Sequence, residues 1–253
     1  MKKHGKHFVT AVLVILALNT GRAIAGSGII SYQANQNPTN QDAYVTQPGN
    51  QFWTRSTGGA GPVGTGINDG GTPAWSVARG SVGAGEEFWT VTPLAADVAT
   101  GNVEGWKLST RLRLPESGRA ASFGSMVDYA DGSRAWTMHF GTDGDGDPIV
   151  TLFNNSTNPS FTLEGAGNTG YHDYLLAYNP LALSANLYVD GVLRISGFVG
   201  QSVGFSRLLF GDAALSTADH DVNYNSVLLV LPEPSSLALL SLGGLALLAR
   251  RRR

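Results

Sequence analysis

The densest group of acidic residues is Asp143, Asp145 and Asp147, which alternate with Gly144 and Gly146. Alternating carboxylates suit calcium, a hard cation that takes about six to eight oxygen ligands. An EF-hand loop has glycine at its sixth position and glutamate at its twelfth, but this chain has proline and asparagine there. The EF-hand motif is therefore absent. Calcium binding is one hypothesis for this segment, and a solvated hairpin loop, in which Asp and Gly favour turns, is the other.

Two further polar groups contain histidine. They are His172-Asp173 and Asp219-His220-Asp221. A histidine beside carboxylates can coordinate a metal or be oriented toward a sugar hydroxyl. Such groups also occur in ordinary turns. We treat these five residues as candidate ligand-binding residues and leave the turn interpretation open.

Catalytic signals are weak in this chain. Retaining glycosidases need two carboxylates about 5 Å apart, and the adjacent Glu86 and Glu87 would point to opposite faces of a strand. No H-E-x-x-H zinc motif and no phosphate-binding Walker loop occurs. The five tryptophans are spread along the chain, and large aromatic residues more often fill a core than a ligand site. We expect that the protein is not an enzyme.

Composition excludes several classes of protein. The chain has 253 residues, no cysteine and only 14% charged residues. Without cysteine there is no disulfide scaffold and no thiolate zinc site. A formal net charge of -2 at pH 7 argues against a nucleic-acid-binding protein, because such proteins present a basic surface.

The first 25 residues are typical of a secretory signal peptide. Three lysines precede an apolar run at residues 8–18, and Ala23 and Ala25 form a small-x-small cleavage pattern. The run is too short to span a hydrocarbon core of about 30 Å. We expect the export machinery to deliver the chain and signal peptidase to cut it after Ala25. A buried first helix is the alternative.

The C-terminal segment combines a chain breaker, an apolar run and a basic tail. Pro232, Glu233 and Pro234 come before the apolar residues 237–249. Four arginines close the chain: Arg250, Arg251, Arg252 and Arg253. The run predicts a short transmembrane helix of about 20 Å. By the positive-inside rule its arginines stay in the cytoplasm, which places residues 26–231 on the opposite side of the membrane.

This order of residues resembles the PEP-CTERM sorting signal of Gram-negative bacteria. The resemblance implies processing by exosortase, a membrane enzyme that cuts near the Pro-Glu-Pro motif. It also implies transient anchoring in the inner membrane and release to the cell surface or extracellular matrix of a host that makes exopolysaccharide. A plain C-terminal anchor is the alternative.

Residues 26–231 predict a single all-β domain, an antiparallel β-sandwich or jelly roll. Apolar and polar residues alternate at 106–114 and 135–140, as in half-buried strands. Asp190-Gly191 lies between two β-forming segments and predicts a type I′ hairpin. Further strands are expected at residues 121–129, 149–153, 174–178, 207–210 and 222–231. No segment longer than about ten residues has a helical apolar period.

Residues 26–85 differ from the rest because they are rich in Gly, Asn, Gln, Thr and Pro. They nevertheless contain Trp53 and Trp75, which a free linker would not need. We interpret this stretch as the irregular first strands of the same sandwich. A disordered arm is the alternative.

Residues 187–192 (LYVDGV) and 208–212 (LLFGD) resemble the late strands of concanavalin A-like, or laminin-G-like, lectin and glucanase domains. The resemblance covers about residues 86–230 and implies a carbohydrate- or protein-binding module. We therefore expect an exported, non-catalytic protein that binds exopolysaccharide or other surface glycans. The alternatives are a secreted glycan-active hydrolase and a structural matrix protein without a specific ligand.

Overall fold

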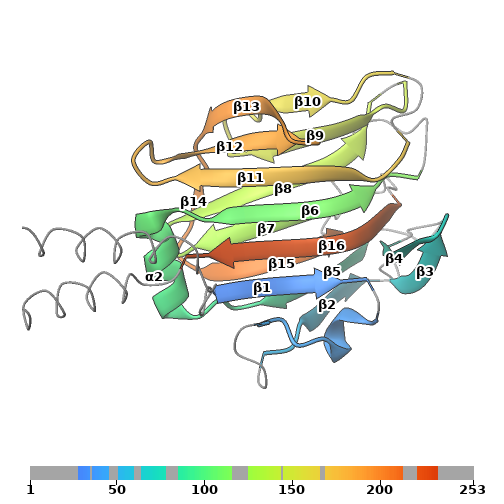
Figure 1. The fold of residues 1–253 in the computed structure, drawn as a ribbon, viewed down its shortest axis with the longest axis horizontal. Helices are drawn as coiled ribbons and strands as arrows, with labels where there is room; N and C mark the ends of the chain where they lie inside the picture. The colour runs from blue at the N-terminus through green and yellow to red at the C-terminus, as the bar shows by residue number, and fades with distance from the viewer. Residues whose placement is uncertain are drawn as a thin grey trace, which may run out of the picture.

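The computed structural model describes residues 28–34, 36–45, 51–59, 64–77, 85–115, 125–143, 145–165, 169–212 and 221–232. These residues form two antiparallel sheets that pack face to face (Figure 1). The predicted antiparallel β-sandwich is confirmed. The predicted signal helix and C-terminal transmembrane helix lie outside the described residues, and within the described ranges no helix has the length and apolar character needed to cross a membrane.

The first sheet holds the strands of the hairpin that the Asp-Gly pair predicts. Its order is β13 (Val192–Phe198), β12 (Ser184–Val189), β11 (His172–Asn179), β6 (Lys107–Arg113), β16 (Val222–Leu231), β4 (Thr72–Val77) and β3 (Thr65–Asp69), and β1 (Gly28–Gln33) pairs with β16.

The second sheet covers the other side of the core. Its order is β10 (Ser160–Thr162), β9 (Pro148–Phe153), β8 (Arg134–Thr142), β7 (Ser125–Asp131), β15 (Ser206–Asp212), β5 (Gly85–Val91) and β2 (Thr54–Gly59), and β14 (Gln201–Ser202) pairs with β8.

Alternation along the strands determines which side chains enter the core. In β6, Leu108, Thr110 and Leu112 are buried, whereas the intervening lysine, serine and arginines are exposed or half-buried. This pattern fits a strand with one face on the core and one face in solvent. The Asp190-Gly191 hairpin is also confirmed, because both residues have positive φ, 50° and 76°, as a type I′ turn requires.

Aromatic contacts join the two sheets across the core. Phe140 of β8 meets Tyr174 of β11 with 4.9 Å between the ring centroids, and Phe210 of β15 meets Tyr224 of β16 at 5.3 Å. Each pair is closer to edge-on than to stacked, an arrangement that aromatic rings favour. All five tryptophans are buried, including Trp53 and Trp75 from the glycine-rich start.

One helix departs from the expectation of an all-strand domain. α2 (Ala95–Glu104) connects β5 to β6, and a short 3-10 helix, η1 (Pro38–Asn40), follows β1. The sequence signal for α2 is weak because Leu94 at its start provides no side-chain cap, and the helix buries only Asp97, Val98 and Gly101. Packing on the sheet, rather than a wide apolar stripe, stabilises such a short helix.

Both ends of the described chain lie at the same end of the sandwich, which we call the terminal end. Gly28, the first residue of β1, pairs with Leu231, the last residue of β16 (Figure 1). Lys107, where β6 begins, pairs with both Val230 and Ala177. The turn at residues 180–183, between β11 and β12, therefore also belongs to the terminal end.

Candidate functional site

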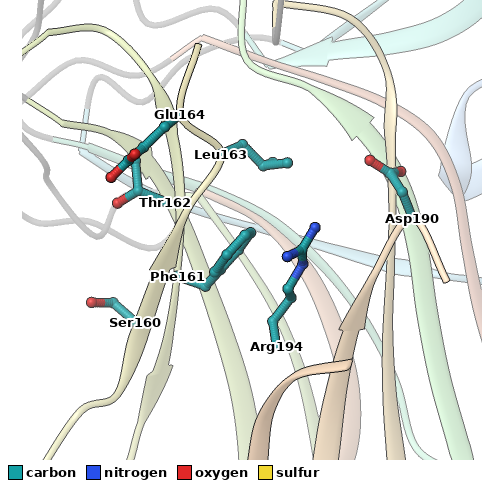
Figure 2. Close-up of a pocket in the computed structure, with 7 residues that line it drawn as sticks. All are labelled: Ser160, Phe161, Thr162, Leu163, Glu164, Asp190 and Arg194. Atoms are coloured by element: carbon teal, nitrogen blue, oxygen red, sulfur yellow. The ribbon is translucent and has the colours of Figure 1, made fainter. Parts of the chain in front are cut away.

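An open groove lies between β10 and β13, the edge strands of the two sheets (Figure 2). Its volume is about 650 Å³, and it is lined by Ser160, Phe161, Thr162, Leu163, Glu164, Asp190 and Arg194. The groove lies near the turn that joins β12 to β13, opposite the terminal end, and we call this the groove end of the sandwich. Edges and turns are the usual place for binding residues on a rigid β scaffold.

Arg194 is the cationic side chain among the described residues that line the groove. Its guanidinium carbon lies 4.5 Å from the centroid of the Phe161 ring, within the range of a cation–π contact. The side chain is exposed, and among the described residues no carboxylate forms an ion pair with it. The ring therefore holds the guanidinium in place while its N–H donors stay available to a ligand.

Asp190 forms the other wall of the groove from the hairpin turn. Its Oδ1 accepts a hydrogen bond from the backbone N–H of Asp173 at 2.9 Å, and its Oδ2 lies 2.8 Å from Nδ1 of His172. Burial raises the pKa of Asp190, but the hydrogen bond from Asp173 and the contact with His172 outweigh it, so the pKa stays below its ordinary value. The carboxylate is thus held in its ionised form.

The two residues predicted at positions 172 and 173 therefore lie beside the groove. His172 is mostly buried and supports Asp190. Asp173 faces solvent and forms an ion pair with Arg111 of the neighbouring strand β6, with 3.0 Å between Oδ2 and Nη1. Both act here as positioning residues for the turn. Their proposed role in contacting a ligand directly stays a prediction.

A second polar network continues from this turn toward β3. Arg111 lies over the ring of Tyr171 at 5.8 Å, and the Tyr171 hydroxyl donates a hydrogen bond to Asp69 Oδ2 at 3.0 Å. Asp69 also receives hydrogen bonds from Arg113 (2.7 Å) and from Asn223 (2.8 Å). Burial raises the pKa of Asp69, but the contacts with Asn223, Tyr171 and Arg113 together lower it below its ordinary value. This network ties the end of β3 to β6, to β16 and to the residue before β11 within the first sheet.

The aspartate-rich loop at residues 143–147 adjoins the other side of the groove. The Asp143 carboxylate accepts the backbone N–H groups of Asp145 and Asp147, each at 3.0 Å. Asp147 Oδ2 accepts the N–H of Gly165, the residue after Glu164. In the described part of the chain no three acidic or histidine side chains converge in a way that would hold a metal ion. Calcium binding by Asp143, Asp145 and Asp147 remains one of the two hypotheses for this loop.

The remaining predicted site residues lie at or beyond the limits of the described chain. Asp219 and His220 are outside the described residues, and Asp221 is half-buried just before β16. Pro232 is half-buried directly after β16. The processing residues Ala23, Ala25, Glu233, Pro234, Arg250, Arg251, Arg252 and Arg253 all lie outside the described residues.

A hydrolase-like string of residues also occurs in the chain. Residues 200–204 read Gly-Gln-Ser-Val-Gly and match the G-x-S-x-G pattern. A nucleophile elbow needs a sharp turn from a strand into a helix. Ser202 instead lies in the two-residue strand β14, where it pairs with Arg134 of β8 and is exposed. The geometry therefore does not fit a catalytic serine.

The groove residues Arg194 and Phe161 carried no recognisable signal in the sequence. They are far apart in the chain and belong to different sheets, so only the closing of the sandwich brings them together.

A second open depression of about 600 Å³ is lined by Gln36, Asn37, Asn68 and the rim of the buried Trp75, among others. Its described lining residues offer amide groups but no charged side chain.

Two sequence profiles match the chain. The family described as "Vibrio cholerae sialidase, lectin insertion" matches residues 75–234. The PEP-CTERM protein-sorting motif matches residues 230–253, which confirms the resemblance of the C-terminal segment to this signal. No curated protein sequence matches the chain significantly.

Solved structures share the fold at low sequence identity. A carbohydrate esterase from the Shiga toxin-encoding bacteriophage phi24B is similar over 82% of this chain and 100% of its own, with 16% identity and a TM-score of 0.56. Botulinum neurotoxin type C, whose cell entry depends on two ganglioside molecules, is similar over 85% of this chain, with 14% identity and a TM-score of 0.54. The binding domain of botulinum neurotoxin DC, solved with SialylT, is similar over 87% of this chain, with 13% identity and a TM-score of 0.53. The chain spans about half the length of these two neurotoxin chains.

Proposed function

Because the chain belongs to the family of the Vibrio cholerae sialidase lectin insertion, we propose that it is a carbohydrate-binding protein without catalytic activity. Its ligand is exopolysaccharide or another glycan at the cell surface. The binding module is the single β-sandwich of residues 26–231, and the groove between β10 and β13 is its binding site. The PEP-CTERM motif at the C-terminus supports export of this module to the place where such glycans occur.

The observation that carries this proposal is the environment of the Arg194 side chain. The guanidinium is exposed, is oriented by the Phe161 ring at 4.5 Å, and has no ion-pair partner among the described residues. Hydroxyl groups and carboxylates of sugars are the acceptors that such a donor fork binds. Asp190, on the same hairpin as Arg194, supplies a hydrogen-bonded carboxylate that can accept sugar hydroxyls. We infer a preference for glycans that carry carboxylates.

Absence of catalysis is part of the same proposal. Among the described residues, Asp190 and Glu164 are the carboxylates that line the groove. The lowered pKa of Asp190 keeps it ionised, whereas a general acid must hold a proton near neutral pH. Asp190 is therefore not suited to the role of general acid. A glycan that binds should therefore be recovered intact, and release of new reducing ends during incubation would favour the hydrolase alternative.

The sorting route is proposed from the two end segments. Signal peptidase removes residues 1–25 after Ala25, and residues 232–253 hold the chain in the inner membrane. Exosortase then acts at the Pro-Glu-Pro motif, and the module reaches the cell surface or the extracellular matrix. The match of residues 230–253 to the PEP-CTERM motif supports this order of events.

Titration of neutral and carboxylated glycans against the Arg194→Ala variant tests the binding site. Loss of a charged hydrogen-bonding partner is worth about 1.5–3 kcal/mol, so we expect the affinity to fall roughly 10- to 100-fold. The matched control is Lys107→Ala, which removes an exposed cation at the terminal end. Equal binding by the parent protein and Arg194→Ala would rule out this groove, and equal loss in the control would indicate only a general charge effect.

A further inference from the structure

The terminal end carries apolar side chains that the fold leaves in solvent. Leu181 is 96% exposed, Val103 is 74% exposed and Leu183 is 62% exposed. Single exposed apolar residues are common on protein surfaces and need no explanation. These three are different because they lie at one end of the sandwich, two on the β11–β12 turn and one near the end of α2.

The β11–β12 turn and the end of α2 are in contact. Gly105, which caps α2, has a φ of 95°, and a Cβ built on it would lie 3.4 Å from Cδ of Pro180 and 2.9 Å from the carbonyl oxygen of Tyr178. The backbone of the turn therefore packs directly on the helix end. Val103, two residues before this cap, and Leu181, one residue after Pro180, project from adjoining segments.

The backbone at Leu183 is strained. Its φ of 51° lies in the left-handed region, where glycine and asparagine are favoured and a leucine is uncommon. A residue with an unfavourable backbone and an exposed apolar side chain contributes little to the stability of the soluble domain. Strain of this kind often marks a functional contact.

The route of the chain indicates what lies next to this surface. Strand β16 ends at Leu231, and five residues, 232–236, separate it from the start of the apolar run at Leu237. Five extended residues reach about 17 Å at most. While the PEP-CTERM segment is uncleaved and lies in the membrane, the terminal end is therefore held close to the bilayer surface.

We propose that the terminal end of the sandwich docks on the bilayer surface before cleavage, with Leu181, Leu183 and Val103 inserted among the lipid headgroups. This inference rests on the proposed sorting route. Lys107, exposed at the same end, faces the anionic headgroups, which attract basic residues near a membrane. Because β12 runs from the terminal end to the Asp190 turn, docking directs the glycan groove away from the membrane.

Single-cysteine labelling tests the docking, because the natural chain has no cysteine. Leu181→Cys and Leu183→Cys carry a polarity-sensitive fluorophore at the terminal end. Leu193→Cys, whose leucine is 49% exposed in β13, is the matched control at the groove end. The exported chain with its C-terminal segment is reconstituted in vesicles of phosphatidylethanolamine and phosphatidylglycerol, and quenching by headgroup-level nitroxide lipids is measured.

The expected result is a blue-shifted emission and strong quenching at positions 181 and 183, with neither at position 193. Emission typical of water at all three positions would overturn the docking. A blue-shifted emission at position 181 that occurs only in membranes containing exosortase, and not in pure lipid vesicles, would also overturn the docking. The partner would then be a protein.

Flotation of the same vesicles separates this inference from the sorting proposal on which it rests. Protein that fails to float with the lipid shows that the C-terminal segment does not anchor the chain, which contradicts the sorting route itself. Protein that floats, with labels that stay in water, contradicts the docking alone. Fluorescence of the buried tryptophans shows that each variant has folded.

Discussion

The two ends of the sandwich differ in where their distinctive side chains lie, in the core at the terminal end and at the surface at the groove end. Inside the terminal end, Trp106 stacks on Tyr178 with 5.3 Å between the ring centroids and meets the edges of Trp136 and Tyr129 at 5.3 Å and 5.0 Å. At the groove end, charged residues such as Arg194 and Asp190 lie on an edge strand and a turn. This aromatic cluster fills the space between the sheets near the chain ends, whereas the groove at the opposite end is lined by charged side chains at the surface.

This difference indicates how stability and binding are separated in the molecule. An aromatic cluster contributes through buried area and ring geometry, so its members are costly to replace. Turn and edge residues contribute little to the core, so they can change with the ligand. If this holds, variants at the two ends should affect different measurements.

The largest expected effect comes from the sorting motif. Changing Pro232, Glu233 and Pro234 together to alanine should leave full-length protein in the inner membrane, because exosortase no longer recognises its motif. Cell fractionation and immunoblotting of the exported chain measure this. Normal cleavage and release of the triple variant would contradict the sorting route.

Replacement of Trp136 should give the next largest effect. Trp136 is fully buried, and its indole N–H donates a hydrogen bond to Asp131 Oδ2 at 2.8 Å. Trp136→Ala should lower the free energy of unfolding by about 3–5 kcal/mol, as large-to-small changes in cores do. Urea denaturation measures the loss. Trp136→Phe, which keeps an aromatic ring, should lose clearly less.

The binding affinity of the folded fraction of Trp136→Ala sharpens the comparison of the two ends. It should equal that of the parent protein, because Trp136 does not line the groove. A parallel loss of affinity and stability would show that the two ends are coupled.

A smaller effect is expected at the hairpin turn of the groove end. Gly191 has a φ of 76°, and a Cβ added there meets no atom within 4 Å, so Gly191→Ala introduces backbone strain without a clash. We expect a loss of about 1–2 kcal/mol in unfolding free energy, with weaker glycan binding because Asp190 moves. Gly204→Ala is the control, since its Cβ also meets open space and its φ is not in the left-handed region. Equal stability of the two variants would contradict the turn assignment.

The smallest expected effect concerns calcium. The Asp143 carboxylate already accepts two backbone N–H groups, so we expect thermal unfolding in calcium to match that in EDTA. A higher melting temperature in calcium would report an ion bound preferentially by the folded state. That result would support the calcium hypothesis for this loop over the hairpin-loop hypothesis.

Local patterns in the sequence predict much of the fold. The alternation at residues 106–114 becomes β6, the segment 222–231 becomes β16, and Asp190-Gly191 forms the expected turn. Each depends on contacts within a few residues, such as side-chain period or the φ that a turn requires. Helix α2 was not predicted, because its stability comes from packing on the sheet.

The candidate site was only partly accessible from the sequence. His172 and Asp173 were selected as polar residues, and the structure places them behind the Asp190 wall of the groove. Arg194 and Phe161 were missed because their contact forms between edge strands of different sheets. A contact between two sheets depends on how the whole sandwich closes. The alternation of apolar and polar residues along one strand does not encode it.

The pairing of Gly28 with Leu231 has a consequence for how this module can be combined with others. A chain that enters and leaves a domain at neighbouring points can replace a surface loop of a host protein without stretching the host backbone. The sandwich is therefore suited to insertion into an unrelated scaffold. Its groove would then lie at the end of the module farthest from the two points of attachment.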